Sequence, residues 1–280
     1  MTTPITIDAD LKIFVGGVLG ESSLANNYQE MAAIAEVLIR QKKARGRTTW
    51  ADFVSKEKTF AFAFSDGTPR YALVMASKDA DFFGTEPIPT QAVTQPATNP
   101  FAVSNILGFP KENATSAQWN MLAEQGMQAD AVAQKPVAIA YKAATDALAG
   151  LTNYSQGAYY WDGYDFKTNA KHFKRRAGFK YGKPSHDIFG VPEEKKTYEK
   201  FTVVTEAGKK VKKLAGSADS VYVSVAAIEG QYTKSSTVTT KDAKGKKTSK
   251  TVKKTIKTGT IFWINNPDYV KHFNGGKDYI

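Results

Sequence analysis

The sequence of 280 residues contains no cysteine, only three histidines, and no apolar run long enough to span a membrane. The absence of cysteine excludes disulfide bonds, thiol nucleophiles and cysteine-ligated zinc. His172, His186 and His272 have no partner at metal-ligand spacing, so we expect neither a metal site nor another cofactor. The first residues also lack the basic and then apolar layout of a secretory signal.

Several motifs of common enzyme classes are also missing. The chain has no glycine-rich phosphate loop and no dinucleotide-binding fingerprint. It lacks the Gly-x-Ser-x-Gly elbow as well, which disfavours a Ser-His-Asp hydrolase. Nucleotide-dependent chemistry and serine hydrolysis are therefore poor interpretations of this chain.

Charge is distributed unevenly along the sequence. Residues 1–165 carry 13 Lys and Arg against 17 Asp and Glu, a net charge of −4, whereas residues 166–280 carry 25 against 10, a net charge of +15. Such asymmetry indicates a near-neutral body joined to a basic portion that meets a polyanion or an acidic partner. A solvated lysine-rich surface without any partner is the alternative.

Hydrophobic periodicity predicts helices first and strands later. Helical spacing is found near residues 11–19, 28–41, 49–54, 70–81, 115–133 and 136–149. Alternating Val-, Thr- and Ile-rich stretches separated by lysine-glycine turns follow at 198–206, 220–232, 234–240, 248–258 and 259–264. This order predicts an α+β fold with a C-terminal part rich in antiparallel β-hairpins.

Two features are compatible with carbohydrate chemistry. Cleavage of a glycosidic bond needs a carboxyl group whose pKa is raised by partial burial, and Glu21 follows an apolar helix at the edge of a core. Sugar rings also stack on aromatic faces, and residues 151–166 are the densest aromatic segment. A solvated glutamate and a run of core aromatics are the alternative interpretation of the same residues.

Four segments resemble motifs of one enzyme family. The opening stretch LKIFVGGVLGESSLANNYQEMAAIAEVLIRQ has a short apolar helix ending in Glu, then a loop and a second helix. TFAFAFSDG, the run from Ala144 to Gly150 followed by GAYYW, and GKPSHDIF come later in matching order. Together they resemble the SleB/CwlJ-type cell-wall hydrolases, a spore-cortex-lytic group with a lysozyme-like fold. The similarity covers about half of the chain.

The resemblance implies a domain organisation and a set of site residues. It implies a mostly helical, lysozyme-like, glycan-cleaving domain over 1–190, with an insertion at about 83–135, and a basic β-rich extension over 191–280. Glu21 would be the catalytic acid. Asp66 is the candidate second carboxylate. The residues expected to bind the saccharide are Ser65, Gln156, Tyr159, Tyr160, Trp161 and His186.

The resemblance implies a peptidoglycan-cleaving glycosidase. Glu21 would protonate the oxygen between N-acetylmuramic acid and N-acetylglucosamine and then accept a proton from the attacking hydroxyl. If water attacks, the enzyme is a muramidase, and if the sugar's own 6-hydroxyl attacks, it is a lytic transglycosylase. We prefer a mechanism in which Glu21 alone acts as acid and base. Glu30 and Glu36 compete for the acid role, but their helical spacing to basic residues favours structural pairing.

The setting of this activity is also an expectation. The chain would be made in the cytoplasm and would act in the periplasm or wall of a target cell. We prefer an interbacterial toxin delivered by a type VI secretion apparatus and blocked by a cognate immunity protein. A phage-type endolysin and a non-enzymatic protein that binds wall polyanions are the alternatives. The lysines of 191–280 favour an anionic wall over nucleic acid, because no arginine stands at base-reading spacing.

Overall fold

The computed structural model describes residues 7–57, 60, 64, 69–83, 136–169, 171, 173–241 and 247–277. The α-helices within these ranges are α1 (Ala9–Glu21), α2 (Tyr28–Ala44), α3 (Trp50–Lys56), α5 (Pro69–Ala76), α6 (Ala80–Phe83), α8 (Pro136–Leu148), α9 (Asp165–Thr168), α10 (Phe173–Ala177) and α11 (Pro267–Phe273). A 3-10 helix, η2, covers Pro184–His186. The strands are β1 (Tyr160–Asp162), β2 (Phe179–Tyr181), β3 (Tyr198–Glu206), β4 (Lys209–Ala218), β5 (Tyr222–Lys241) and β6 (Lys247–Asn265).

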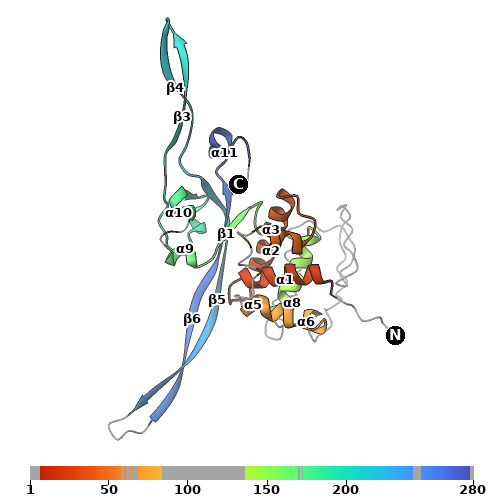
Figure 1. Ribbon diagram of the computed structural model, residues 1–280. Coiled ribbons are helices and arrows are strands. Elements are labelled where there is room, and N and C mark those ends of the chain that lie inside the picture. Colours follow the sequence, from red (N-terminus) through yellow and green to blue (C-terminus); the bar gives the residue numbers. More distant parts are fainter. Residues whose placement is uncertain are drawn as a thin grey trace, which may run out of the picture.

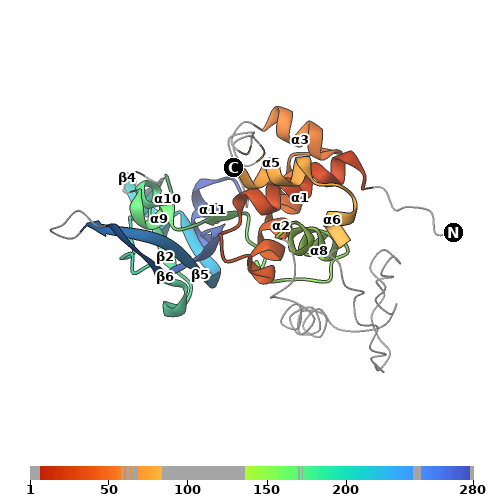
Figure 2. The ribbon, with the colours of Figure 1, turned by 90° about the horizontal axis from the view of Figure 1, so that it is seen from below.

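The helices from α1 to α8 form a body on one side of the sheet (Figures 1 and 2). Helix α2 packs against α8, and α1 packs against α5 and α8. Asn27 caps α2 by accepting hydrogen bonds from the backbone N–H groups of Gln29 and Glu30. Its buried face supplies much of the first hydrophobic core, in which Met31, Ile34 and Leu38 are fully buried. Burial of this apolar stripe accounts for the length and stability of α2.

A glycine pair explains how α1 is held in the body. A Cβ atom built on Gly16 would lie 2.7 Å from the ring of Tyr71, and one built on Gly17 would lie 2.1 Å from the ring of Phe64. Both distances are too short for any side chain. The two glycines weaken α1 as an isolated helix, but they let two aromatic rings lie directly on its backbone.

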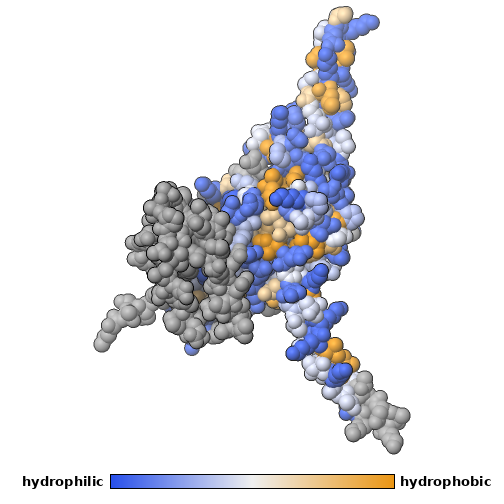
Figure 3. Space-filling model, turned by 180° about the vertical axis from the view of Figure 1, so that it is seen from behind, coloured by the Kyte–Doolittle hydropathy of each residue, from blue (hydrophilic) through white to orange (hydrophobic). Residues whose placement is uncertain are grey.

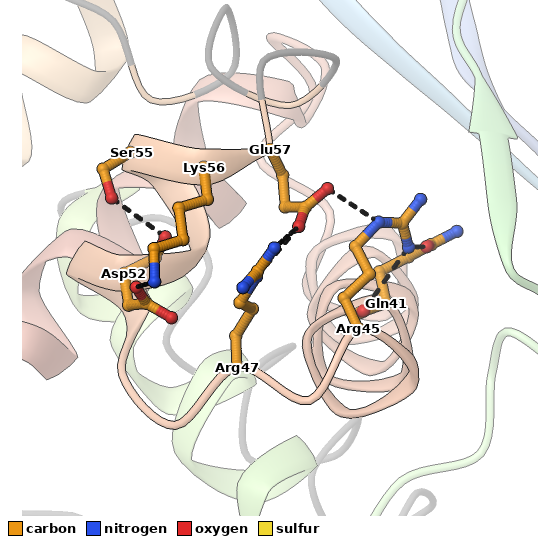
Figure 4. A network of polar contacts seen from close by, with 7 residues as sticks. All are labelled: Gln41, Arg45, Arg47, Asp52, Ser55, Lys56 and Glu57. Atoms are coloured by element: carbon orange, nitrogen blue, oxygen red, sulfur yellow. Dashed lines mark hydrogen bonds and ion pairs between the residues drawn. The ribbon is translucent and has the colours of Figure 1, made fainter.

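The end of α2 is tied to α3 by charged side chains (Figure 4). Arg45 and Arg47 donate to the two carboxylate oxygens of Glu57, at 3.0 Å and 2.7 Å. A separate pair, Lys56 and Asp52, lies on the other side of α3 at 2.7 Å. The Glu57 pairs are partly buried, so they resist screening better than the exposed Asp52 pair.

The main sheet has the strand order β1-β6-β5-β2, in which β5 pairs antiparallel with β6 and parallel with β2. A bulge interrupts the β5–β6 register between Ser224 and Ala226. Strands β1 and β2 precede the expected boundary at residue 190, whereas β5 and β6 follow it. One sheet thus contains segments from both expected domains.

The two faces of this sheet cover different cores. Phe262 of β6 belongs to the first core, beside the helical body. Its neighbours Ile261 and Trp263 belong to a second core with Phe166 and Phe179, on the opposite face. Successive strand residues point to opposite faces, so this alternation follows from the sequence pattern.

Two hairpins extend away from the rest of the molecule (Figures 1 and 3). Strands β3 and β4 form a separate two-stranded sheet, and the far halves of β5 and β6 form a second arm. Both arms are largely hydrophilic, with small apolar groups along them (Figure 3). Phe201, Val203 and Leu214 on the first arm are more than half exposed.

The α+β class predicted from sequence is confirmed, with helices first and antiparallel hairpins later. The helix expected over 70–81 is divided into α5 and α6, because the Asp81 carboxylate accepts the N–H of Lys78 at 3.0 Å and starts a new helix. The strands expected at 220–232 and 234–240 form one strand, as do those at 248–258 and 259–264. The insertion lies almost wholly outside the described residues. Within the described ranges, no helix is long and apolar enough to cross a membrane.

Candidate active site

Glu21 is the last residue of α1, and the chain after it is firmly anchored. The N–H of Ser22 donates to the carbonyl of Val18 at 3.1 Å, and Ser22 then takes an extended conformation that ends the helix. Arg70 of α5 donates to the carbonyl of Leu19 at 2.9 Å and to the hydroxyl of Ser22 at 3.1 Å. These contacts hold the backbone on both sides of Glu21 at the helix end.

Trp161 of β1 holds the Glu21 carboxylate directly. Its indole Nε1 donates to Glu21 Oε2 at 3.0 Å, across 140 residues of sequence. Trp161 lies opposite Phe262 in the β1–β6 pair, so both side chains point to the face that the helical body covers. The contact therefore joins the end of α1 to the edge of the sheet.

The surroundings of Glu21 favour its protonated form. Burial raises the pKa of the Glu21 carboxyl above its usual value, and the negative charges of Asp165 and Asp162 raise it further. The hydrogen bond from Trp161 acts in the opposite direction and is outweighed by burial. The carboxylate also lies at a helix C-terminus, where the macrodipole disfavours negative charge. A carboxyl whose pKa is raised by its environment is suited to donating a proton.

Two carboxylates that the sequence analysis did not select lie within electrostatic range of Glu21. Asp162 is buried and pairs with the buried ammonium of Lys174 at 3.3 Å. Asp165, the first residue of α9, is exposed. Both belong to the segment Asp162-Gly-Tyr-Asp165 directly after Trp161, and this closeness to the aromatic run was the available signal. Asp165 is thus a solvent-accessible second carboxylate beside the buried acid.

The Lys174 ammonium lies over two tyrosine rings at the second core. Its charge is 5.2 Å from the ring centre of Tyr160 and 5.6 Å from that of Tyr222. Burial lowers the pKa of Lys174, and the charge of Asp162 partly offsets this effect. Two aromatic faces and one carboxylate together stabilise a buried cation.

The expected saccharide-binding residues lie in different places. Trp161 contacts Glu21, but Tyr160 points to the opposite face of the sheet, where it packs edge-on against Tyr222. Tyr159 is half-buried, and its carbonyl accepts a hydrogen bond from Gln41. Gln156 is exposed in a turn, with a φ of 49°.

The remaining predicted residues are not brought to Glu21 by any described contact. His186 is buried in η2, where its Nδ1 lies 2.8 Å from the hydroxyl of Ser224, a contact that links η2 to β5. This contact gives His186 a structural position at the far edge of the sheet. Ser65 and Asp66 lie outside the described residues.

Glu30 and Glu36 are structural acceptors within α2. Glu30 accepts from the hydroxyl of Thr260 and that of Ser23, each at 2.6 Å. Glu36 accepts from the N–H groups of Tyr154 and Ser155, at 2.9 Å and 3.0 Å. Glu30 thus binds α2 to β6, and Glu36 binds α2 to the loop before β1.

A hollow of about 560 Å³ lies beside the loop that follows Glu21. Its walls include Ala25 and Asn27 from that loop, Gly230 and Thr258 from the β5–β6 pair, and Ile188 from the loop after η2. Thr258 shares the body-facing side of β6 with Thr260 and Phe262, by the two-residue alternation of a strand. The other lining residues, Glu229, Gln231 and Lys257, belong to the alternate set, and Ile188 packs on the second core, so the hollow reaches both sides of the β5–β6 pair at its edge.

Comparisons of the chain with protein-family models, with curated proteins and with solved structures find no match. Among the described residues, no group of three or more histidine or acidic side chains is placed to hold a metal ion.

Proposed function

We propose that this protein is a glycosidase that cleaves peptidoglycan between N-acetylmuramic acid and N-acetylglucosamine, with Glu21 as the acid and base. The observation that carries the proposal is the Glu21 carboxyl, partly buried, raised in pKa and held by Trp161 at 3.0 Å. The hollow beside the loop that follows Glu21 supports the binding of an extended ligand.

The proposed reaction uses the two protonation states of Glu21 in turn. The protonated carboxyl donates to the glycosidic oxygen as the bond to the sugar breaks, and the resulting carboxylate accepts a proton from the attacking hydroxyl. Attack by water gives hydrolysis, and attack by the 6-hydroxyl gives a 1,6-anhydro sugar. The Trp161 N–H stabilises the carboxylate that forms after the first proton transfer.

Asp165 is the described residue best suited to assist this reaction. Its carboxylate is exposed and acts electrostatically on Glu21. A negative charge in this position favours the positive charge that develops on the sugar ring in the transition state. The second carboxylate expected from the sequence is Asp66, which lies outside the described residues.

We also propose that the enzyme is an antibacterial effector that reaches the wall of another cell through a secretion apparatus. The two exposed basic arms support this proposal, because they add binding surface outside the helical body. The proposal implies an immunity protein that blocks the site. Expression directed to the periplasm would lyse the host and expression in the cytoplasm would not; equal growth in both cases would contradict it.

The enzymatic proposal is tested by clearing of a peptidoglycan-containing gel. Wild type is expected to clear the gel and Glu21→Gln to lose clearing, because an amide cannot donate the proton. Glu199→Gln on the exposed strand β3 is the matched control and should clear like wild type. Clearing by Glu21→Gln would refute the role of Glu21, and no clearing by wild type would favour a non-enzymatic wall-binding protein.

A further inference from the structure

The hairpin arm formed by β5 and β6 begins at the hollow, where Gly230 and Thr258 lie on the side of the arm that faces the helical body. Beyond Gly230 and Thr258, the next cross-strand pair on that side is Tyr232 with Ile256, both half-buried. The pair after it is Lys234 with Lys254, both exposed. Strand geometry places Lys254 about 13 Å beyond Thr258 and about 26 Å beyond Phe262, which lies opposite Trp161.

Lys234 and Lys254 form a like-charged pair that the fold itself does not neutralise. Directly opposite residues in an antiparallel pair have Cβ atoms about 5 Å apart, and like charges in this arrangement destabilise the hairpin. Within the part of the chain that the structure describes, neither ammonium has a carboxylate partner. A single anionic group placed between the two side chains would contact both.

We propose that this pair binds carboxylates of the peptide stems of peptidoglycan, so that the enzyme recognises peptide-bearing glycan rather than bare sugar chains. The inference rests on the proposed function. The glycan lies in the hollow, and the stems reach along the arm to Lys234 and Lys254. Lysine suits this role because an ammonium contacts carboxylates from many directions. Recognition of nucleic acid bases favours arginine instead, and the chain has no arginine after Arg176.

The opposite face of the same arm provides a matched control. Lys247 and Lys253 are also exposed, but they belong to the alternate set of residues and point to the other side of the hairpin. Replacing either pair by glutamine removes the same charge from the same element. A general attraction to anions would respond to both changes equally, whereas the proposed site responds only to the first.

The test measures co-sedimentation with purified sacculi at low salt, in the Glu21→Gln background so that the sacculi stay intact. Lys234→Gln with Lys254→Gln is expected to weaken binding about tenfold, as the loss of two charge contacts requires. Lys247→Gln with Lys253→Gln should bind like the parent. An amidase that removes the stems also dissolves the sacculi, so binding to the soluble glycan strands is measured by fluorescence anisotropy of the labelled strands, and there the first pair of substitutions should have no effect.

Four results would overturn the inference: no loss of binding from either lysine pair, equal losses from the two pairs, an undiminished loss on stripped strands, or tighter binding to duplex DNA that depends on Lys234 and Lys254. The clearing assay distinguishes a failure of the stem-binding site from a failure of the proposed function. If wild type clears no peptidoglycan, the proposed function fails. If it clears normally and both lysine pairs bind like the parent, only the stem-binding site fails. Circular dichroism of each variant confirms that the fold is retained.

Discussion

The contact between Trp161 and Glu21 should respond to pH in a way that depends on the charge of Glu21. A hydrogen bond to a charged carboxylate contributes about 1.5–3 kcal/mol, and one between neutral groups about 0.5–1.5 kcal/mol. Trp161→Phe removes the donor and keeps an aromatic ring, and Glu21→Ala removes the acceptor. The coupling energy between the two changes therefore reports the state of this bond.

Burial raises the pKa of Glu21 in the folded protein above its value in the unfolded chain. Between these two pKa values, the folded protein therefore binds more protons than the unfolded chain does. Folding stability attributable to Glu21 is then highest below the unfolded pKa and falls as the pH rises through the folded pKa. Glu21→Ala removes this decline. In Trp161→Phe the pKa of Glu21 rises further, because the lost bond favours the carboxylate.

Urea unfolding of the four proteins in the cycle, at about pH 4 and about pH 8, measures these quantities. We expect a coupling of about 2 kcal/mol at the higher pH and a smaller one at the lower pH. A coupling energy near zero at both pH values would mean that the Trp161–Glu21 hydrogen bond does not exist in solution. Equal, non-zero coupling energies would mean that Glu21 does not change its protonation state between the two pH values.

Two further changes test the packing that positions the site. Gly17→Ala should destabilise the fold by about 1–2 kcal/mol, because its Cβ would lie 2.1 Å from the Phe64 ring. This overpacking outweighs the gain in helix propensity. A thermal midpoint equal to or above that of wild type would contradict this expectation. Glu36→Gln should cost about 3 kcal/mol in urea unfolding, because the loop before β1 loses its buried carboxylate acceptor. Asp52→Asn, which breaks an exposed pair, should cost much less, and equal losses from the two would refute the structural role of Glu36.

Local signals in the sequence predict α1, α2, α3 and α8 well, whereas α9, α10 and α11 were not expected. Asn27 and Thr49 cap α2 and α3, as their residue types indicate, and α8 begins at Pro136, a residue type favoured at the first position of a helix. The lysine-glycine turn at Gly208 correctly separates β3 from β4. These features depend on neighbours in sequence, so a pattern of a few residues carries the information.

Contacts between distant segments lie outside such patterns. The sequence supplies a reason to select Glu21 and a separate reason to select Trp161, but no local pattern can reveal a hydrogen bond between positions 140 apart. Alternation predicts that Tyr160 and Trp161 point to opposite faces, yet only the sheet order shows which face meets Glu21. Asp165 was missed for the same reason, because its relation to Glu21 depends on how β1 and α9 pack beside α1.

Mass spectrometry of the soluble products released from purified sacculi tests the central claim most directly. Wild type should release muropeptides that end at N-acetylmuramic acid, either as reducing sugars or as 1,6-anhydro sugars, and Glu21→Gln should release none. Products cut within the peptide stems, or the same saccharide ends from Glu21→Gln, would contradict the assignment of Glu21 as the acid that breaks the glycosidic bond.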